Sequence, residues 1–202
     1  MKKVTDMAAA ILAGGRNSRM SGHNKAFIHI NGIAIIDRTE RLLKEIFEEV
    51  IIVTNSLQHF KPYEKEAVIA TDIIKDIGPL GGMHSALSTT SRESVFFVAC
   101  DMPFLHNEII RNQIDCFNRV NCDCLIPRIG NFIEPLHAIY RKSLKDKIQN
   151  FVRASTGYSV KSFLETTDAY FWDLENSALN RKIFRNLNTQ QDLEEAGGML
   201  CR

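Results

Sequence analysis

A glycine-rich turn carrying basic residues follows the first apolar segment of the chain. Residues 12–20 read Leu-Ala-Gly-Gly-Arg-Asn-Ser-Arg-Met, and Lys25 comes shortly afterwards. Adjacent glycines let successive backbone N–H groups point at an anion. Arg19 can bind phosphate oxygens through its guanidinium fork, and Lys25 can bind them as a point charge. These residue types predict a loop that cradles phosphates, although two glycines alone leave a plain turn with solvated basic side chains equally open.

The loop matches neither of the two common phosphate-binding templates. Gly-x-x-x-x-Gly-Lys-Ser/Thr is absent because Lys25 lies between Asn24 and Ala26, and Gly-x-Gly-x-x-Gly is absent as well. A P-loop kinase and a dinucleotide-binding oxidoreductase therefore both lose support.

Acidic residues follow two other predicted strands. Asp101 comes after the apolar run at 94–99, and Asp72 comes after a shorter run at 68–70. Because ligands of open parallel sheets bind beyond the carboxyl ends of the strands, both acids should lie near the phosphate loop. Phosphate-bound Mg²⁺ prefers one or two carboxylates, so Asp101 is the expected metal ligand. The alternatives are a turn cap before Pro103 for Asp101 and a solvated turn residue for Asp72.

A second glycine-rich segment, residues 78–82, reads Gly-Pro-Leu-Gly-Gly. It is expected to break the chain ahead of a helix near 83–88. A helix start without bulky side chains can approach a planar base or a sugar closely, and its free N–H groups favour anions. This segment is the second candidate ligand-binding loop.

The elements that must position these loops alternate along the chain. Apolar or β-branched runs predict strands at 8–13, 27–30, 50–53, 68–70, 94–99, 124–127, 133–140 and 170–174. Amphipathic spacing predicts helices at 36–47, 83–88, 107–117, 143–151 and 160–164. A last helix opens at 188–189, with Thr189 as the expected N-cap and Asp192 three residues on. The alternation predicts one α/β domain over 1–202, three-layered and Rossmann-like, with a mostly parallel central sheet.

The composition excludes several classes of protein. The 202 residues are 45% hydrophobic and 24% charged, with a formal net charge of +1. That balance is typical of a folded domain and gives no electrostatic footprint for a dedicated nucleic-acid binder. No apolar run is long enough to cross a bilayer, and the apolar stretch at 7–12 is too short for a signal peptide. A cytoplasmic protein without membrane partners is therefore expected.

The five cysteines are odd in number and irregular in spacing. Cys122 and Cys124 could serve as a metal or redox pair, but no second pair lies at zinc-finger distance. Reduced thiols are the expected state.

Several motifs together resemble the signature of the molybdenum cofactor guanylyltransferase family, a branch of the nucleotidyltransferases built like nucleotide-diphosphosugar synthases. The matching segments span nearly the whole chain and lie at 12–15, 19–20, 25–26, 72, 78–82, 100–104, 134–140 and 186–193. The resemblance implies Mg²⁺-dependent transfer of GMP from GTP to the terminal phosphate of the molybdenum-bound pterin, molybdopterin, with release of pyrophosphate. It also implies a nucleotide-binding half over 1–105 and an acceptor-binding half over 106–202.

The resemblance further implies roles for individual residues. Lys25, Asp101 and Arg19 would be catalytic, with Asp101 holding Mg²⁺. The nucleotide would lie against Leu12, Ala13, Gly14, Gly15, Lys25, Asn55, Asp72, Gly78, Pro79, Leu80, Gly82 and Asp101. The acceptor would meet Arg153, Lys161, Asn186 and Asn188. Proteins that deliver the cofactor or receive the product would be further partners.

This chain also departs from the family at several positions. Relatives that use CTP read Leu-Ala-Ala-Gly in the first loop, and the resemblance associates Gly14 with a purine. Ser21 and Asn24 stand where the family usually has Gly and Asp. Tyr158 and Ser159 stand where relatives often carry basic residues, and Arg153 and Lys161 flank them here.

Three other functions stay open on the sequence. One is a CTP-dependent or sugar-phosphate nucleotidyltransferase of the same superfamily. Another is a non-catalytic carrier that binds a nucleotide or the cofactor, and the third is a scaffold whose glycine loops only turn the chain. The absence of Gly-x-Ser-x-Gly agrees with a reaction that forms no covalent enzyme intermediate.

Overall fold

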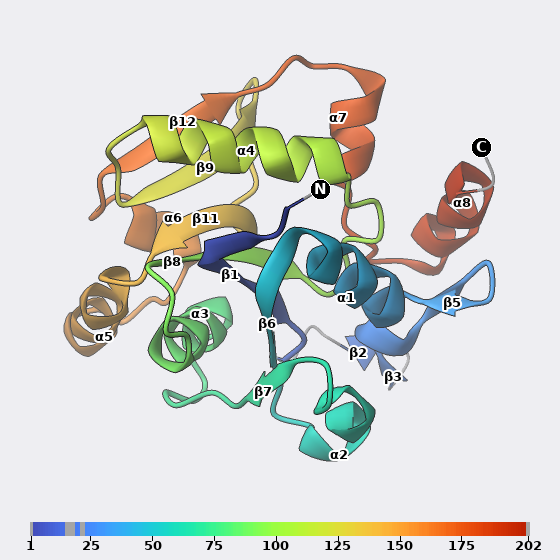
Figure 1. The fold of residues 1–202 in the computed structure, drawn as a ribbon, viewed down its shortest axis with the longest axis horizontal. Coiled ribbons are helices and arrows are strands. Elements are labelled where there is room, and N and C mark those ends of the chain that lie inside the picture. The colour runs from blue at the N-terminus through green and yellow to red at the C-terminus, as the bar shows by residue number, and fades with distance from the viewer. Residues whose placement is uncertain (1, 15–18, 21–22, 201–202) are drawn as a thin grey trace.

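The computed structural model describes residues 2–14, 19–20 and 23–200 (Figure 1). Within these residues an eight-stranded sheet runs in the order β10-β9-β11-β8-β1-β6-β7, and β12 also pairs with β9. Four neighbouring strands are parallel to one another, β8 (Ser94–Ala99), β1 (Val4–Leu12), β6 (Phe47–Val53) and β7 (Val68–Ala70), and β7 forms one edge of the sheet. The others are β9 (Cys124–Ile129), β10 (Phe132–Ile133), β11 (His137–Arg141) and β12 (Ala169–Asp173). Because β11 and β10 run antiparallel, the sheet is mostly but not wholly parallel, which confirms the predicted α/β class.

Helices cover both faces of this sheet and complete three layers (Figure 1). One face packs against α1 (Ile35–Ile46), α4 (Asn107–Arg119) and α7 (Ala178–Ile183). The opposite face packs against α3 (Pro79–Thr89), α5 (Leu144–Ala154) and α6 (Val160–Leu164). Strand β1 alternates between the two cores, with Ala9 and Ile11 in one and Ala8 and Ala10 in the other. Since alanine side chains are small, they let both helical layers approach the middle of the sheet closely.

Short elements after β1 and the last helix lie together beside the carboxyl ends of the central strands (Figure 1). They are β2 (Arg19–Met20), β3 (His23–Asn24), the 3-10 turn η2 (Lys25–Phe27), β4 (His29–Ile30), β5 (Ile33–Ala34) and α8 (Gln190–Leu200). Ile30 on β4 and Ala196 on α8 belong to one small apolar cluster with Leu187. The amide of Asn31 also donates to the Gly197 carbonyl at 3.1 Å, so α8 is fastened to the hairpin β4–β5.

Two predicted helix boundaries are corrected. The first amphipathic helix ends at Ile46, because Phe47 pairs with Val4 and starts β6. The helix expected near 83 begins at Pro79 instead, so most of the glycine-rich segment is helical. Gly78 takes the left-handed φ of +63° just before it, and proline suits the first helical position.

Other elements depart from the pattern in smaller ways. The segment expected to be extended over 133–140 is interrupted between β10 and β11. The pattern does not predict α2 (Leu57–Phe60), the 3-10 turn η3 (Lys61–Tyr63), α7 or the hairpin β2–β3. Among the described residues, no helix has both the length and the apolar character needed to cross a bilayer.

Candidate active site

The first glycine turn and Asp101 leave the sheet from neighbouring strands. The backbone N–H of Ala13 donates to the Val53 carbonyl at 2.9 Å, and that of Cys100 donates to the Leu12 carbonyl at 3.2 Å. These bonds continue the strand pairing beyond the ends of β1 and β8. The turn and the acid therefore begin side by side, as expected for the carboxyl ends of parallel strands.

Lys25 joins these two segments. Its side chain is buried, with 5% of the residue exposed, and its Nζ donates to Asp101 Oδ2 at 3.2 Å and to Asn188 Oδ1 at 2.9 Å. A buried ammonium is tolerated only when it is paired and hydrogen-bonded. The structure thus brings three predicted site residues together, because Asp101 and Asn188 both accept from the Lys25 amine.

Asn24 sets the position of Lys25. Its Oδ1 accepts from the Ala26 N–H at 3.0 Å, which caps the 3-10 turn η2 that begins at Lys25. Its Nδ2 donates to the Ala13 carbonyl at 3.5 Å and ties that turn to the end of β1. Since asparagine supplies the same kind of acceptor as aspartate, the departure at position 24 keeps the cap.

Asn55 and Asp72 form a reciprocal pair at the ends of β6 and β7. Asn55 Nδ2 donates to Asp72 Oδ2 at 2.7 Å, and the Asp72 N–H donates to Asn55 Oδ1 at 3.2 Å. A Cβ on Gly14 would lie 3.8 Å from both the backbone N and the Nδ2 of Asn55. The three residues therefore line one stretch of the carboxyl edge of the sheet, adjacent to the glycine turn.

Packing leaves little room for side chains at the glycines that start α3, most strictly at Gly81. A Cβ on Gly81 would lie 2.7 Å from the Ile74 carbonyl, and one on Gly82 would lie 2.9 Å from Leu12 Cδ2. Leu80 is completely buried, so contact between its side chain and a nucleotide would require α3 to move. The close packing of this helix on the sheet therefore explains these glycines. The sequence analysis considered only the approach of a ligand.

Gly78 and Pro79 are exposed at the N-terminal end of the same helix. At this end of the helix Pro79 has no N–H, and the Gly81 N–H donates to the Gly78 carbonyl at 3.1 Å. The positive end of the helix dipole lies here. Of the residues predicted in this segment, these two are the ones that a ligand can reach directly.

A buried carboxyl group lies close enough to Asp101 to feel its charge. Glu134 is 6% exposed, and its oxygens accept from the Leu136 N–H at 3.1 Å and from Asn186 Nδ2 at 3.4 Å. Burial raises the pKa of Glu134, the negative charge of Asp101 raises it further, and the positive charge of Lys161 opposes both. The sequence analysis places Glu134 in the matching segment 134–140 but assigns it no role at the site; its signal is an acid within an apolar stretch.

The four residues predicted to bind the acceptor do not all lie at the site. The Leu187 N–H donates to the Asp101 carbonyl at 2.9 Å, which brings Asn186 and Asn188 on either side of it to the site. Lys161 is exposed and close enough to Glu134 to affect its pKa. Arg153 is exposed at the end of α5, and no hydrogen bond or ion pair among the described residues joins it to the others.

Two predicted contributions fall outside the described part of the chain. These are Gly15 and the side chain of Arg19, of which the structure describes only the backbone in β2. Their roles stay predictions.

Asp101 presents a carboxylate that could hold a divalent cation together with groups from a substrate. Its side chain is 20% exposed, and within the described residues only Oδ2 is hydrogen-bonded. No group of three or more His, Cys, Asp or Glu side chains in that part of the chain could hold a metal by itself. A single carboxylate completed by phosphate oxygens and water is the arrangement that Mg²⁺ commonly adopts.

The cysteine pair offers no metal site in the structure. Cys122 and Cys124 are both buried and free. Burial raises the pKa of Cys124 to about 12, so its thiol stays protonated and is a poor ligand. Neither residue forms a disulfide in the structure, and reduced thiols stay the expected state.

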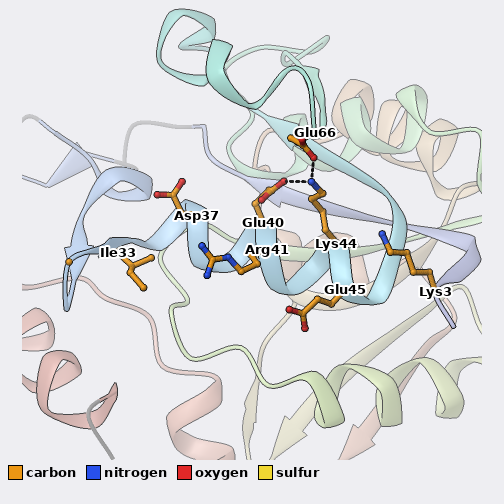
Figure 2. A pocket seen from close by; sticks show the side chains of 9 residues that line it. Lys3, Ile33, Asp37, Glu40, Arg41, Lys44, Glu45 and Glu66 are labelled. Carbon is orange, nitrogen blue, oxygen red and sulfur yellow. Dashed lines mark hydrogen bonds and ion pairs between the residues drawn. The ribbon is translucent and has the colours of Figure 1, made fainter. Parts of the chain in front are cut away.

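A surface depression elsewhere on the molecule is not the candidate site. Its side chains come mainly from the outer face of α1, as Figure 2 shows, together with Lys3 and Glu66. Lys44 pairs there with Glu40 and Glu66, so its charge is already balanced. Lys3 precedes β1 and Glu66 precedes β7, so that part of the depression lies at the amino ends of the parallel strands, away from the candidate site at their carboxyl ends.

Comparisons with known proteins agree on one family. A family model described as a MobA-like NTP transferase domain matches residues 9–170. The chain is 36% identical over 195 residues to a probable molybdenum cofactor guanylyltransferase of Peptoclostridium acidaminophilum, covering 93% of this chain and 87% of that protein. It is 31% identical over 191 residues to the molybdenum cofactor guanylyltransferase of Syntrophotalea carbinolica, covering 93% and 89%.

A solved structure has the same fold along nearly its whole length. Molybdopterin-guanine dinucleotide biosynthesis protein A from Archaeoglobus fulgidus superposes with a TM-score of 0.81 at 25% identity. The match covers 96% of this chain and 98% of that chain.

Proposed function

The chain belongs to the MobA-like NTP transferase family, and from this premise we propose that it transfers GMP from GTP to the terminal phosphate of molybdopterin. The relatives named molybdenum cofactor guanylyltransferase support guanylyl transfer over the CTP or sugar-phosphate alternative. The observation that carries the proposal is the contact between Lys25 and Asp101 at 3.2 Å. It brings the predicted phosphate loop and the predicted metal-binding acid within reach of one nucleotide.

The reaction needs little covalent chemistry from the protein. An oxygen of the acceptor phosphate attacks the α-phosphorus of GTP, and a new P–O bond forms. The bond from that phosphorus to the α,β-bridging oxygen breaks, and its electron pair leaves with pyrophosphate. Because the attacking oxygen is already anionic at neutral pH, no general base is required. Catalysis then rests on orientation and on stabilising negative charge.

Lys25 supplies positive charge to the phosphates in this proposal, and Arg19 and the backbone N–H groups of the glycine turn assist it. Burial strengthens the electrostatic effect of the Lys25 amine, because water does not screen it well. Asn24 fixes the turn on which Lys25 stands, so the charge is held in place before a substrate arrives.

Asp101 would hold Mg²⁺ in the active enzyme. A bound Mg²⁺ would neutralise phosphate charge and polarise the phosphoryl oxygens as a Lewis acid. The partial exposure of the carboxylate and its position beside Lys25 support this role.

The guanosine part would lie along the edge formed by Leu12, Ala13 and Gly14. Asn55 and Asp72 present amide and carboxylate groups beside Gly14, and such groups can hydrogen-bond the base or the ribose. The exposed start of α3 at Gly78 and Pro79 lies next along this edge. A residue without a side chain at position 14 leaves room for a purine.

The acceptor would enter from the side of Asn186, Asn188 and Lys161, with Arg153 as a more distant contact. Residues 1–105 would supply most of the nucleotide site and residues 106–202 most of the acceptor site, within a single domain. The contact of Lys25 with Asn188 supports this division because it joins the two halves at the reacting centre. A cytoplasmic location, and proteins that deliver the pterin or receive the product, belong to the same proposal.

Pyrophosphate release across the four nucleoside triphosphates, with Mg²⁺ and molybdenum cofactor present, tests the proposal. We expect release with GTP that depends on both the metal and the cofactor. Release with CTP instead would point to the sister activity. A carrier would bind GTP and raise the melting temperature without releasing pyrophosphate, and a scaffold would show no thermal shift at all.

A further inference from the structure

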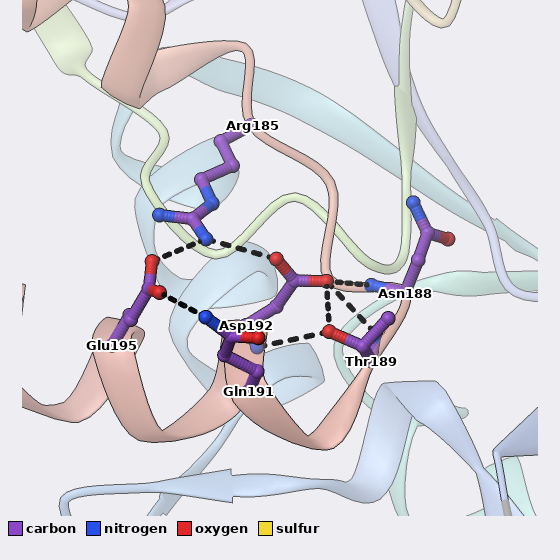
Figure 3. A network of polar contacts seen from close by, with 6 residues as sticks. All are labelled: Arg185, Asn188, Thr189, Gln191, Asp192 and Glu195. Carbon is purple, nitrogen blue, oxygen red and sulfur yellow. Dashed lines mark hydrogen bonds and ion pairs between the residues drawn. The ribbon is translucent and has the colours of Figure 1, made fainter.

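The turn that brings Asn188 to Lys25 is held by one carboxylate. Asp192 Oδ2 accepts from the Asn188 N–H at 2.9 Å, from the Thr189 N–H at 2.8 Å and from the Thr189 hydroxyl at 2.8 Å. The Asp192 N–H donates back to Thr189 Oγ1 at 3.1 Å. This is a reciprocal cap of α8, and Figure 3 shows its bonds converging on Asp192.

Arg185 fixes Asp192 from the opposite side. Its Nη2 donates to Asp192 Oδ1 at 2.9 Å and to Glu195 Oε2 at 2.6 Å. The pair is partly shielded, with 29% of the Arg185 side chain and 20% of the Asp192 side chain exposed. Arg185 and the capping bonds hold the pKa of Asp192 well below its usual range, so the carboxylate stays charged.

The cap leaves the Asn188 side chain free to act elsewhere. In Figure 3 that side chain points away from the Asp192 network, which uses only the backbone N–H of Asn188. Its Oδ1 accepts from Lys25 Nζ at 2.9 Å. The backbone of this one residue is therefore fixed by Asp192 while its side chain fixes the amine.

The same segment is anchored on the residues before and after this contact. The Leu187 N–H bonds the Asp101 carbonyl, and Leu187 and Ala196 pack in the apolar cluster that contains Ile30. A shift of the turn would therefore move Asn188 relative to Asp101 rather than move the whole site. Leu187 fixes the chain on one side of Asn188, and the Arg185–Asp192 pair fixes the backbone N–H of Asn188 itself.

We propose that Arg185 and Asp192 are positioning residues for the transfer reaction, which they serve by holding the Asn188 amide oxygen against the Lys25 amine. The inference rests on the proposed function for its effect on turnover. It does not place either residue in contact with a substrate. Asp192 acts through Asn188 on Lys25, and Arg185 acts through Asp192.

Two readouts test this chain of contacts. The first is the rate at which Lys25 is acetylated by a small reagent, followed by mass spectrometry with exposed Lys65 as the internal reference. The second is kcat and KM for GTP in the pyrophosphate assay. The variants are Asp192→Ala, Asp192→Asn and Arg185→Gln, and the matched control is Glu194→Gln, which changes an exposed acid on the same helix outside the network.

Asp192→Ala should raise the labelling rate of Lys25 relative to Lys65 and lower kcat by about 10-fold to 100-fold, as expected for a misplaced catalytic group. Asp192→Asn keeps an oxygen for the capping bonds, so it should recover part of both values. Arg185→Gln should fall between these two variants, and Glu194→Gln should match the parent chain.

Unchanged Lys25 labelling in a folded Asp192→Ala variant would overturn the inference. So would a loss of kcat that Asp192→Asn and Asp192→Ala share equally without any change in labelling. If the parent chain itself fails to release pyrophosphate, the proposed function fails. The labelling comparison needs no substrate and still decides whether the pair positions Lys25.

Discussion

The Lys25 amine lies 3.2 Å from the Asp101 carboxylate, and both groups come from loops at the carboxyl ends of adjacent strands. Because Lys25 is buried, its charge requires a partner within the fold. The group expected to bind phosphate and the group expected to bind a cation thus balance one another. The Asn188 side-chain oxygen is a second acceptor for this amine, so the amine keeps a hydrogen bond when Asp101 binds a cation instead.

Replacing the Asp101 carboxylate should stop turnover and leave the fold intact. In Asp101→Asn the side chain keeps an oxygen that can accept from Lys25 but loses the charge that attracts a metal. We expect kcat for GMP transfer to fall by about 100-fold or more, the size of effect seen when a charge-stabilising group is removed. Pyrophosphate release at saturating GTP measures this loss.

The control for that variant is Asp115→Asn, which changes an exposed acid on α4. It should keep the activity of the parent chain. Activity of Asp101→Asn equal to that of the control would remove Asp101 from the catalytic centre.

A methyl group at position 14 should change the choice of base without changing stability. The Cβ of Gly14→Ala would lie 3.8 Å from Asn55 and Thr54, which is ordinary contact, so the free energy of unfolding should stay within about 0.5 kcal/mol. The added methyl would instead face the guanosine. We expect kcat/KM for GTP relative to CTP to fall by about 10-fold or more, since one methyl can discriminate by that factor.

Urea unfolding and nucleotide competition together check this prediction. Gly157→Ala is the matched control, because a Cβ there meets nothing within 4 Å. An unchanged GTP preference in a stable Gly14→Ala protein would mean that position 14 does not face the base.

Most of the fold can be predicted from the sequence because the apolar runs that form the central strands are short and distinct. Strand β8 begins and ends where the run at 94–99 predicts. The meeting of the glycine turn and Asp101 follows from the same reasoning, since parallel strands present their carboxyl ends at one edge. The boundary between a helix and a strand is less predictable where the apolar spacing of the helix continues into the strand. Phe47 extends the spacing of the preceding helix, yet pairing with Val4 makes it a strand residue.

The contacts that complete the site are not visible in local patterns. Lys25 and Asn188 are 163 positions apart, and tertiary contacts bring them together, among them the packing of α8 against the hairpin β4–β5 and the bond from the Leu187 N–H to the Asp101 carbonyl. Glu134 lies within a segment predicted from its apolar residues. Its contact with Asn186 depends on the path of the chain after α7. Tertiary structure therefore decides these contacts rather than residue type.

Adding a methyl group to Gly81 should destabilise the protein although alanine is the better helix former. The new Cβ would lie 2.7 Å from the Ile74 carbonyl, a backbone atom that cannot swing away. We expect a loss of about 1–3 kcal/mol, as for other overpacked sites. The midpoint and slope of urea unfolding measure it.

Gly198→Ala on α8 makes the same chemical change in open space. It should stabilise the protein by about 0.5–1 kcal/mol, which is the helix-propensity difference between the two residues. Equal effects of the two substitutions would contradict the tight packing of α3 on the sheet.

Glu134 should make stability depend on pH in the direction opposite to that of a salt-bridged acid. Burial raises the pKa of Glu134 above the ordinary value of 4.5, so the folded chain holds its proton more tightly than the unfolded chain. The stabilisation is therefore complete below the ordinary pKa and is lost as pH rises through the higher folded value. Above that value the fold must accommodate a buried charge close to Asp101.

Glu134→Gln mimics the protonated acid and should not lose this contribution. Its amide can still accept from the Leu136 N–H, and it can donate to Asn186 Oδ1, a buried oxygen that has no hydrogen-bond partner among the described residues. Urea unfolding between about pH 4 and pH 8 should show the stability of the variant rising relative to the parent as pH increases. Glu64→Gln, at an exposed acid, should follow the parent at every pH. A constant difference between Glu134→Gln and the parent across this range would show that the carboxyl is charged without cost in the folded state.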